Sequence, residues 1–181
     1  MDEISTSLLL VILAVLIFLS AYFSGSETGM MSINRYRLRH LVQSNHRGAK
    51  RVQHLLDRPD RLIGLILIGN NLVNIGASAI ATIICLRWFG DAGIVIATFG
   101  LTLIILIFSE VTPKTIAALH PERVSFPSSL ILLPLLKVMY PVVIGVNAIT
   151  NTFMRILGVN PKQSQMADAL SSEELRTVVN E

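Results

Sequence analysis

Charged residues are scarce in this sequence. Only 15% of its 181 residues are Asp, Glu, Lys or Arg, whereas 52% are hydrophobic, and the mean hydropathy is +0.62. A water-soluble domain of this size needs more charge to stay dispersed, so the composition is typical of an integral membrane protein. Where the few charges lie is more informative than the net charge of +3.

Cysteine and enzyme motifs are nearly absent as well. The one cysteine, Cys85, lies in an apolar run, so no intramolecular disulfide can form and an inert buried thiol is expected. The sequence has no H-E-x-x-H motif, and its four histidines fall in predicted loops, away from any serine at membrane depth. We therefore expect no enzymatic activity, and nucleic-acid binding is not expected of such a chain.

The N-terminus lacks the features of a cleaved signal peptide. Asp2 and Glu3 precede the first apolar run, where a signal peptide would carry positive charge, and no A-x-A site follows. We interpret this run as a retained transmembrane helix.

Four apolar stretches follow one another. Three of them supply the roughly 20 residues that a helix needs to cross a bilayer, and they predict helices over about 5–31, 61–87 and 92–117. The fourth contains Pro127, Pro134 and Pro141, with Lys137 in its middle. We therefore expect short half-buried helices or a re-entrant hairpin over about 124–157, and juxtamembrane helices over about 35–58. The fold class is an all-α membrane protein.

The basic residues predict its orientation. Eight of the 15 Lys and Arg residues lie between the first two apolar stretches, and none precedes the first stretch. By the positive-inside rule this loop is cytoplasmic and the N-terminus is outside. If the fourth stretch does not cross, the tail is cytoplasmic; if it crosses, the tail is outside. In the tail, Ser171 and Glu174 fit a capping box that would start a soluble helix.

Polar residues at membrane depth mark the candidate site, because such residues usually face the interior of a bundle. The first helix contributes Ser24, Ser26 and Glu27, the second Asn70, Asn71, Asn74 and Ser78, and the third Ser109 and Glu110. Asn70, Asn74 and Ser78 are spaced by four and share one helix face. A single Asn of this kind can equally be a hydrogen-bonding contact between helices, worth about 0.6–2 kcal/mol, and Glu27 can equally be an interfacial partner of the basic loop.

Pro113 follows Glu110 closely and has no N–H, so in a regular helix the carbonyl of Ser109 loses its donor. A simple helix stop is the alternative interpretation. Together with a serine hydroxyl and an asparagine amide, Glu110 would form an all-oxygen site suited to a hard cation such as Mg²⁺.

At these residues the chain resembles the CNNM/CorC family of magnesium transport proteins, and its bacterial CorB-like branch most closely. The motifs are "AYFSGSETGMMSINRYRLRH", "RPDRLIGLILIGNNLVNI" and "SEVTPKTIAALHPERV", which cover most of residues 20–126. The resemblance implies a homodimer of three-helix protomers with juxtamembrane helices, in the bacterial inner membrane. It also implies that residues 158–181 begin a cytosolic linker to a CBS-pair module, absent here, that binds ATP.

The resemblance further implies Mg²⁺ efflux coupled to Na⁺. The family's ion ligands match Ser24, Asn74 and Glu110, with Asn70 as a further match and backbone oxygen from Ser109 or the turn after Pro113. Ser26, Glu27, Asn71, Ser78, Pro113 and Lys114 complete a candidate ion path, although Lys114 also fits an interfacial anchor. The alternative function is a Mg²⁺-sensing scaffold that regulates another transporter.

Overall fold

The computed structural model describes residues 5–158, so the expected linker and its capping box lie outside the described residues. Within this range all regular elements are helical: α1 (Thr6–Ser32), α2 (Arg35–Gln43), α3 (Arg47–Leu56), α4 (Pro59–Phe89), η1 (Gly90–Ala92), α5 (Gly93–Ile104), the π-helix η2 (Ile105–Val111), α6 (Thr112–Leu119) and α7 (Pro121–Ile156). The expectation of an all-α membrane chain is confirmed.

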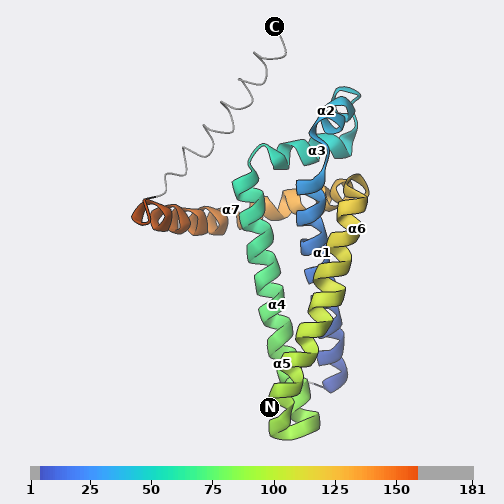
Figure 1. Cartoon of the computed structure of the whole chain (residues 1–181), viewed down its shortest axis with the longest axis vertical. Helices are drawn as coiled ribbons and strands as arrows, with labels where there is room; N and C mark the ends of the chain where they lie inside the picture. Colours follow the sequence, from blue (N-terminus) through green and yellow to red (C-terminus); the bar gives the residue numbers. More distant parts are fainter. Residues whose placement is uncertain (1–4, 159–181) are drawn as a thin grey trace. The chain divides into compact units, whose positions relative to one another are not determined.

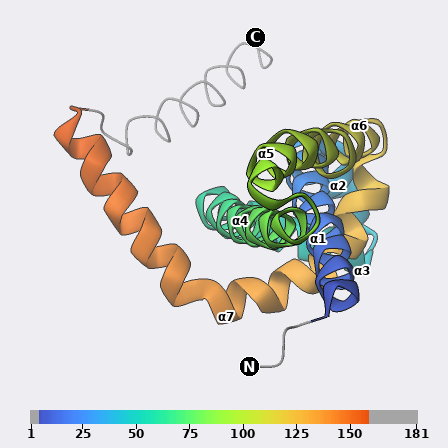
Figure 2. The ribbon, with the colours of Figure 1, turned by 90° about the horizontal axis from the view of Figure 1, so that it is seen from below.

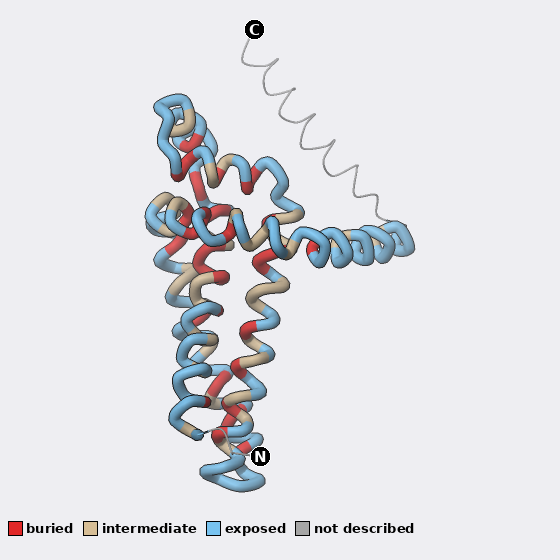
Figure 3. The backbone as a smooth tube through the Cα atoms, turned by 180° about the vertical axis from the view of Figure 1, so that it is seen from behind, coloured by how far each residue is buried: buried red, intermediate tan, exposed pale blue. Residues whose placement is uncertain are grey.

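Three long helical passes lie side by side in the unit formed by residues 1–140 (Figure 1). They are α1, α4 and the continuous α5–η2–α6 segment, and α1 contacts both of the others. Helix α1 is antiparallel to α4 (Figure 1). Buried residues gather where these passes meet, and most outward positions are exposed (Figure 3). Exposed apolar side chains on long apolar helices are what a lipid environment requires.

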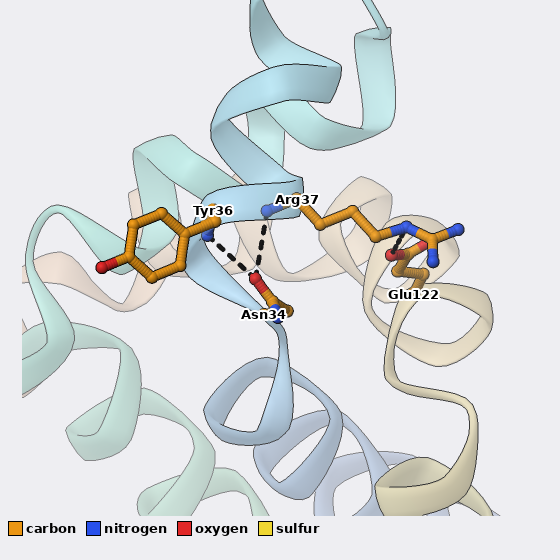
Figure 4. A network of polar contacts seen from close by, with 4 residues as sticks. All are labelled: Asn34, Tyr36, Arg37 and Glu122. Atoms are coloured by element: carbon orange, nitrogen blue, oxygen red, sulfur yellow. Dashed lines mark hydrogen bonds and ion pairs between the residues drawn. The ribbon is translucent and has the colours of Figure 1, made fainter.

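Local sequence explains where the helices begin. The Ser5 hydroxyl accepts from the Leu8 amide and caps α1, and Pro59 occupies the first turn of α4, where its missing N–H costs nothing. The Asn34 side chain accepts from the amides of Tyr36 and Arg37 at the start of α2, and Arg37 pairs with Glu122 at 2.6 Å (Figure 4). This cluster ties the end of α1 and the start of α2 to the first turn of α7.

The expectation that prolines divide the fourth apolar stretch is wrong. Residues 121–156 form one continuous helix, α7, with all three prolines inside it. A proline removes one backbone hydrogen bond and bends a helix, but burial of Ser125, Ser129 and Leu132 supports this segment. Residues 121–140 pass across α1 and α4 rather than along them (Figure 2).

Three continuous helical stretches within residues 5–158 are long and apolar enough to cross a membrane: Thr6–Ser32, Pro59–Leu119 and Pro121–Ile156. The second contains the turn at η1, so it holds two of the three passes described above. Length and composition thus allow α7 to cross, and the expectation that it does not cross stays a prediction.

The turn between α4 and α5 depends on a close approach at Gly93. A Cβ atom there would meet the backbone carbonyl group of Cys85 in α4. Gly100, seven residues later in α5, has no neighbouring atom within 4 Å of its own Cβ position. Alanine substitutions at these two glycines of α5 can therefore be compared as a test and its control.

We expect Gly93→Ala to lower the midpoint of thermal unfolding in detergent, because the added methyl must push α5 away from α4 at a cost of about 1–3 kcal/mol. Gly100→Ala should leave the midpoint unchanged or raise it, since glycine disfavours a helix interior by about 1 kcal/mol relative to alanine. Equal midpoints for the two variants would contradict the close approach.

Candidate functional site

The segment of α1 from Ser20 to Gly25 lies between the other two passes. The Ser20 hydroxyl donates to Asn70 Oδ1 of α4 at 3.1 Å, and the Phe23 ring occupies the space that a Cβ at Gly69 would need. On the other side, a Cβ at Gly25 would lie 3.5 Å from the Pro113 side chain. The small residues of "FSGSETG" thus let α1 approach both passes closely.

The third pass changes its hydrogen bonding beside Glu110. Residues Ile105–Val111 are π-helical, and the Thr112 amide bonds to the Ile107 carbonyl, five residues back. Pro113 does not stop the helix, which continues to Leu119. Pro113 lies five residues after Phe108 and four after Ser109, so both carbonyls lie where the bonding changes register. Such π-turns occur frequently at functional sites.

Two of the expected ligand atoms are buried without a partner. Ser24 Oγ and Asn74 Oδ1 make no hydrogen bond within the described residues, and the same holds for Ser125 Oγ. A buried polar atom left unpaired costs about 1–3 kcal/mol, so native proteins rarely contain one without a reason. Both atoms are hard oxygen donors of the kind that Mg²⁺ accepts.

A groove of about 410 Å³ runs between α4 and the third pass. Asn74 and Ser78 line it from α4, and Thr98, Thr102 and Glu110 line it from the facing helix. Glu110 is half-buried, and no ion pair or hydrogen bond of its carboxylate occurs between residues 5 and 158. The groove thus has a single carboxylate among neutral oxygens.

Ser24 lies at a different level from Asn74. Because α1 and α4 are antiparallel and Ser20 contacts Asn70, four residues displace Ser24 and Asn74 from that contact in opposite directions. At 1.5 Å per residue the two backbone positions differ by roughly 12 Å along the helices. Both side chains lean toward each other, because Cβ atoms point to the helix N-terminus. The structure therefore brings Asn74, Ser78 and Glu110 together, with Ser24 about two turns away.

The other candidate residues have different surroundings. Ser26 turns toward α7, where its hydroxyl lies 2.9 Å from Ser128 Oγ and donates to the Tyr22 carbonyl. The Ser109 hydroxyl donates to the Ile17 carbonyl, which fastens the π-helix to α1. Asn71 is exposed, whereas Glu27 and Lys114 are half-buried. No cluster of three His, Cys, Asp or Glu side chains occurs in the described part of the chain.

Sequence reasoning missed three polar residues here. Ser20 is fully buried and holds Asn70, while Thr98 and Thr102 line the groove. A periodic signal was present: Ser20 precedes Ser24 by four residues, and Thr98, Thr102, Leu106 and Glu110 are also spaced by four. Thr98 and Thr102 donate their hydroxyls to the carbonyls of Ile94 and Thr98 in their own helix. Threonines can satisfy their hydroxyls in this way in any membrane helix, so the sequence alone did not mark them as site residues.

Long apolar helices with a polar groove between them define a multi-pass helical membrane protein. The family profile described as the cyclin M transmembrane N-terminal domain (CNNM) matches residues 11–181. The chain belongs to this family, which confirms the resemblance drawn from its motifs.

Relatives extend this finding. The chain is 56% identical to the UPF0053 inner membrane protein YfjD of Escherichia coli and 54% identical to a UPF0053 protein of Haemophilus influenzae, in each case over its whole length. It spans 42% and 43% of those two proteins. It is also 26% identical, over 92% of its length, to the polyamine export protein of Haemophilus influenzae, of which it covers 41%.

The two serines of "SGS" give opposite stability predictions in Mg²⁺-free buffer. Ser24→Ala should raise the free energy of unfolding by about 1 kcal/mol, because it removes a buried oxygen that has no partner. Ser26→Ala should lower it by a similar amount, because it removes bonds to Tyr22 and Ser128. Thermal unfolding in detergent with EDTA measures both, and a loss of stability in Ser24→Ala would show that its hydroxyl already has a partner.

Proposed function

We propose that this chain is the membrane domain of a Mg²⁺ transporter. The observation that carries the proposal is Asn74 Oδ1, a buried oxygen without a partner in the described residues that lines the same groove as the carboxylate of Glu110. Ser24 Oγ, about two turns away on α1, is a second buried oxygen of this kind. A divalent cation that moves along this path would be coordinated by each of these oxygens in turn, and it would compensate for the negative charge of the half-buried Glu110. Asn70 and backbone oxygen near Ser109 complete the proposed ligand set.

The charge of the site favours release of the ion. One carboxylate faces two positive charges, so we expect an affinity near about 1 mM, far weaker than that of sites with several carboxylates. Mg²⁺ gives up its water reluctantly, and a full negative charge is needed to offset that loss. Lys114 has no ion pair with Glu110 in the described residues, which leaves the carboxylate free for the cation.

The offset between Ser24 and Asn74 suggests how transport is coupled to motion. One ion cannot contact both directly in this arrangement, because Mg²⁺–oxygen distances are about 2.1 Å. We infer that α1 slides along α4 as a largely dehydrated ion passes, a shear of the kind that packed helices permit. The small residues facing Pro113 and Phe23 would allow this movement.

Direction and coupling rest on the family resemblance. We propose export of Mg²⁺ driven by Na⁺ entry, with the basic α2–α3 region on the cytoplasmic side and the N-terminus outside. A bacterial inner membrane is the proposed location, because the relative YfjD is named an inner membrane protein. Labelling of an Asp91→Cys variant in a Cys85→Ala background would report the orientation of the α4–α5 turn in sealed vesicles.

A homodimer is proposed as well. Asn71 is exposed on a membrane-spanning helix and has no hydrogen-bond partner within residues 5–158. Ser78, Thr98 and Thr102 are exposed along the adjoining groove. Polar groups are costly against lipid, so a second copy covering this face would remove that cost.

We expect Glu110→Gln to reduce Mg²⁺ flux in proteoliposomes to background, because it removes the only full charge of the site while keeping its shape. Flux is measured with and without a Na⁺ gradient, with size-exclusion chromatography to check folding, and with spermidine as a second cargo. Wild-type Mg²⁺ flux in the variant would refute the site. Mg²⁺ binding without flux in the wild-type chain would instead favour the sensing scaffold.

Asn74→Ala and Asn71→Ala provide a matched pair on one helix. We expect Asn74→Ala to weaken Mg²⁺ binding about tenfold, as expected for loss of one interaction with a charged partner. Asn71→Ala should change binding by less than about twofold, since its side chain lies on an exposed face. Calorimetric titration with Mg²⁺ measures both, and the reverse order would place the ion on the other face of α4.

A further inference from the structure

Lys137 is a charge that the proposed transport site leaves unexplained. It interrupts the apolar run "SSLILLPLLKVMYPVV", where a lysine is costly unless it has a partner or reaches the interface. In the structure it borders a second cavity of about 650 Å³, together with His54 of α3, Arg61 of α4 and Tyr140 of α7. All these residues lie within the unit of residues 1–140.

The cavity combines positive charge with an apolar wall. Its ionisable lining groups other than the tyrosine are the basic side chains of His54, Arg61 and Lys137, and no carboxylate lines it. The nearby carboxylates in sequence, Asp57 and Asp60, are exposed and lie outside the lining. Leu133 and Leu136 form part of the wall, so the cavity suits a molecule with an anionic group and an apolar part.

The Arg61 side chain is held in a fixed orientation beside the cavity. Its guanidinium lies 5.1 Å from the centre of the Tyr140 ring, a cation–π contact that orients the side chain. Arg61 is also the third residue of the membrane-spanning helix α4, which begins at Pro59. The cavity therefore lies beside the end of a transmembrane helix, on the side that carries the chain's basic residues.

We propose that this cavity binds the phosphate group of an anionic phospholipid, with the start of an acyl chain against Leu133 and Leu136. Basic pockets at the ends of transmembrane helices recognise such headgroups through charge and phosphate hydrogen bonds. A soluble phosphate ion would satisfy the cations but leave the apolar wall uncovered. The cavity volume and the position of Lys137 in an apolar run therefore favour a lipid.

Native mass spectrometry of the full chain in detergent tests the proposal, with phosphatidylglycerol and phosphatidylcholine as probes. We expect phosphatidylglycerol to be retained in preference to phosphatidylcholine. Lys137→Gln and Arg61→Gln should each weaken its retention about fivefold, the effect expected for one basic residue near an anionic lipid. Lys137→Arg should retain it.

Lys50→Gln is the matched control, because it removes the same charge from α3 at a residue that bonds Asn45 and lies outside the cavity. An equal loss in Lys50→Gln would overturn the proposal in favour of diffuse surface attraction. Displacement of the lipid by millimolar inorganic phosphate would overturn it in favour of a soluble anion. Equal retention of phosphatidylcholine would also overturn it, and circular dichroism of each variant separates these outcomes from misfolding.

Discussion

Lipid offers no hydrogen bonds, so every polar atom inside the bundle must find its partner within the protein or in a bound ion. The packing of α1 between the other two passes follows from this constraint. Ser20 satisfies Asn70, Ser109 satisfies the Ile17 carbonyl, and Ser26 approaches Ser128. In contrast to these paired groups, Ser24 Oγ and Asn74 Oδ1 have no hydrogen-bond partner within the described residues. Both are oxygen atoms of the kind that a hard cation would coordinate.

Close helix contacts and the proposed sliding of α1 are compatible in this fold because most contacts at α1 involve small residues. Glycine and serine let the backbones approach closely, with the Phe23 ring at Gly69 as the large side chain at this contact, so much of the packing energy comes from many weak contacts. The π-turn beside Glu110 adds a second irregularity, where backbone carbonyls change their bonding register. The proposed ion transport would use both features, since an ion must be bound in one conformation and released in another.

Several of the chain's basic side chains contact α7 rather than the groove at Glu110. Arg37 pairs with Glu122, Arg51 donates to Ser129, and Arg61 lies over Tyr140, so basic residues of α2, α3 and α4 all contact the part of α7 between residues 122 and 140. The basic residues on which the proposed cytoplasmic orientation rests thus also hold residues 122–140 of α7 against α2, α3 and α4. Lys137 is the counterpart from α7 itself, facing the same cavity as Arg61.

Hydropathy and basic-residue placement by themselves determined the all-helical membrane class and the approximate passes, because the bilayer imposes a length and a composition on any crossing helix. The motifs determined the family and singled out Asn74 and Glu110. Only the tertiary structure decided that α7 continues through three prolines, each of which removes a helical hydrogen bond and by itself predicts a break. It also decided that Ser26 faces α7, that Ser20 holds Asn70, and that Ser24 lies two turns from Asn74. Periodicity places a residue on a face of its own helix, but the relative height and contacts of two helices depend on side-chain packing across the whole bundle.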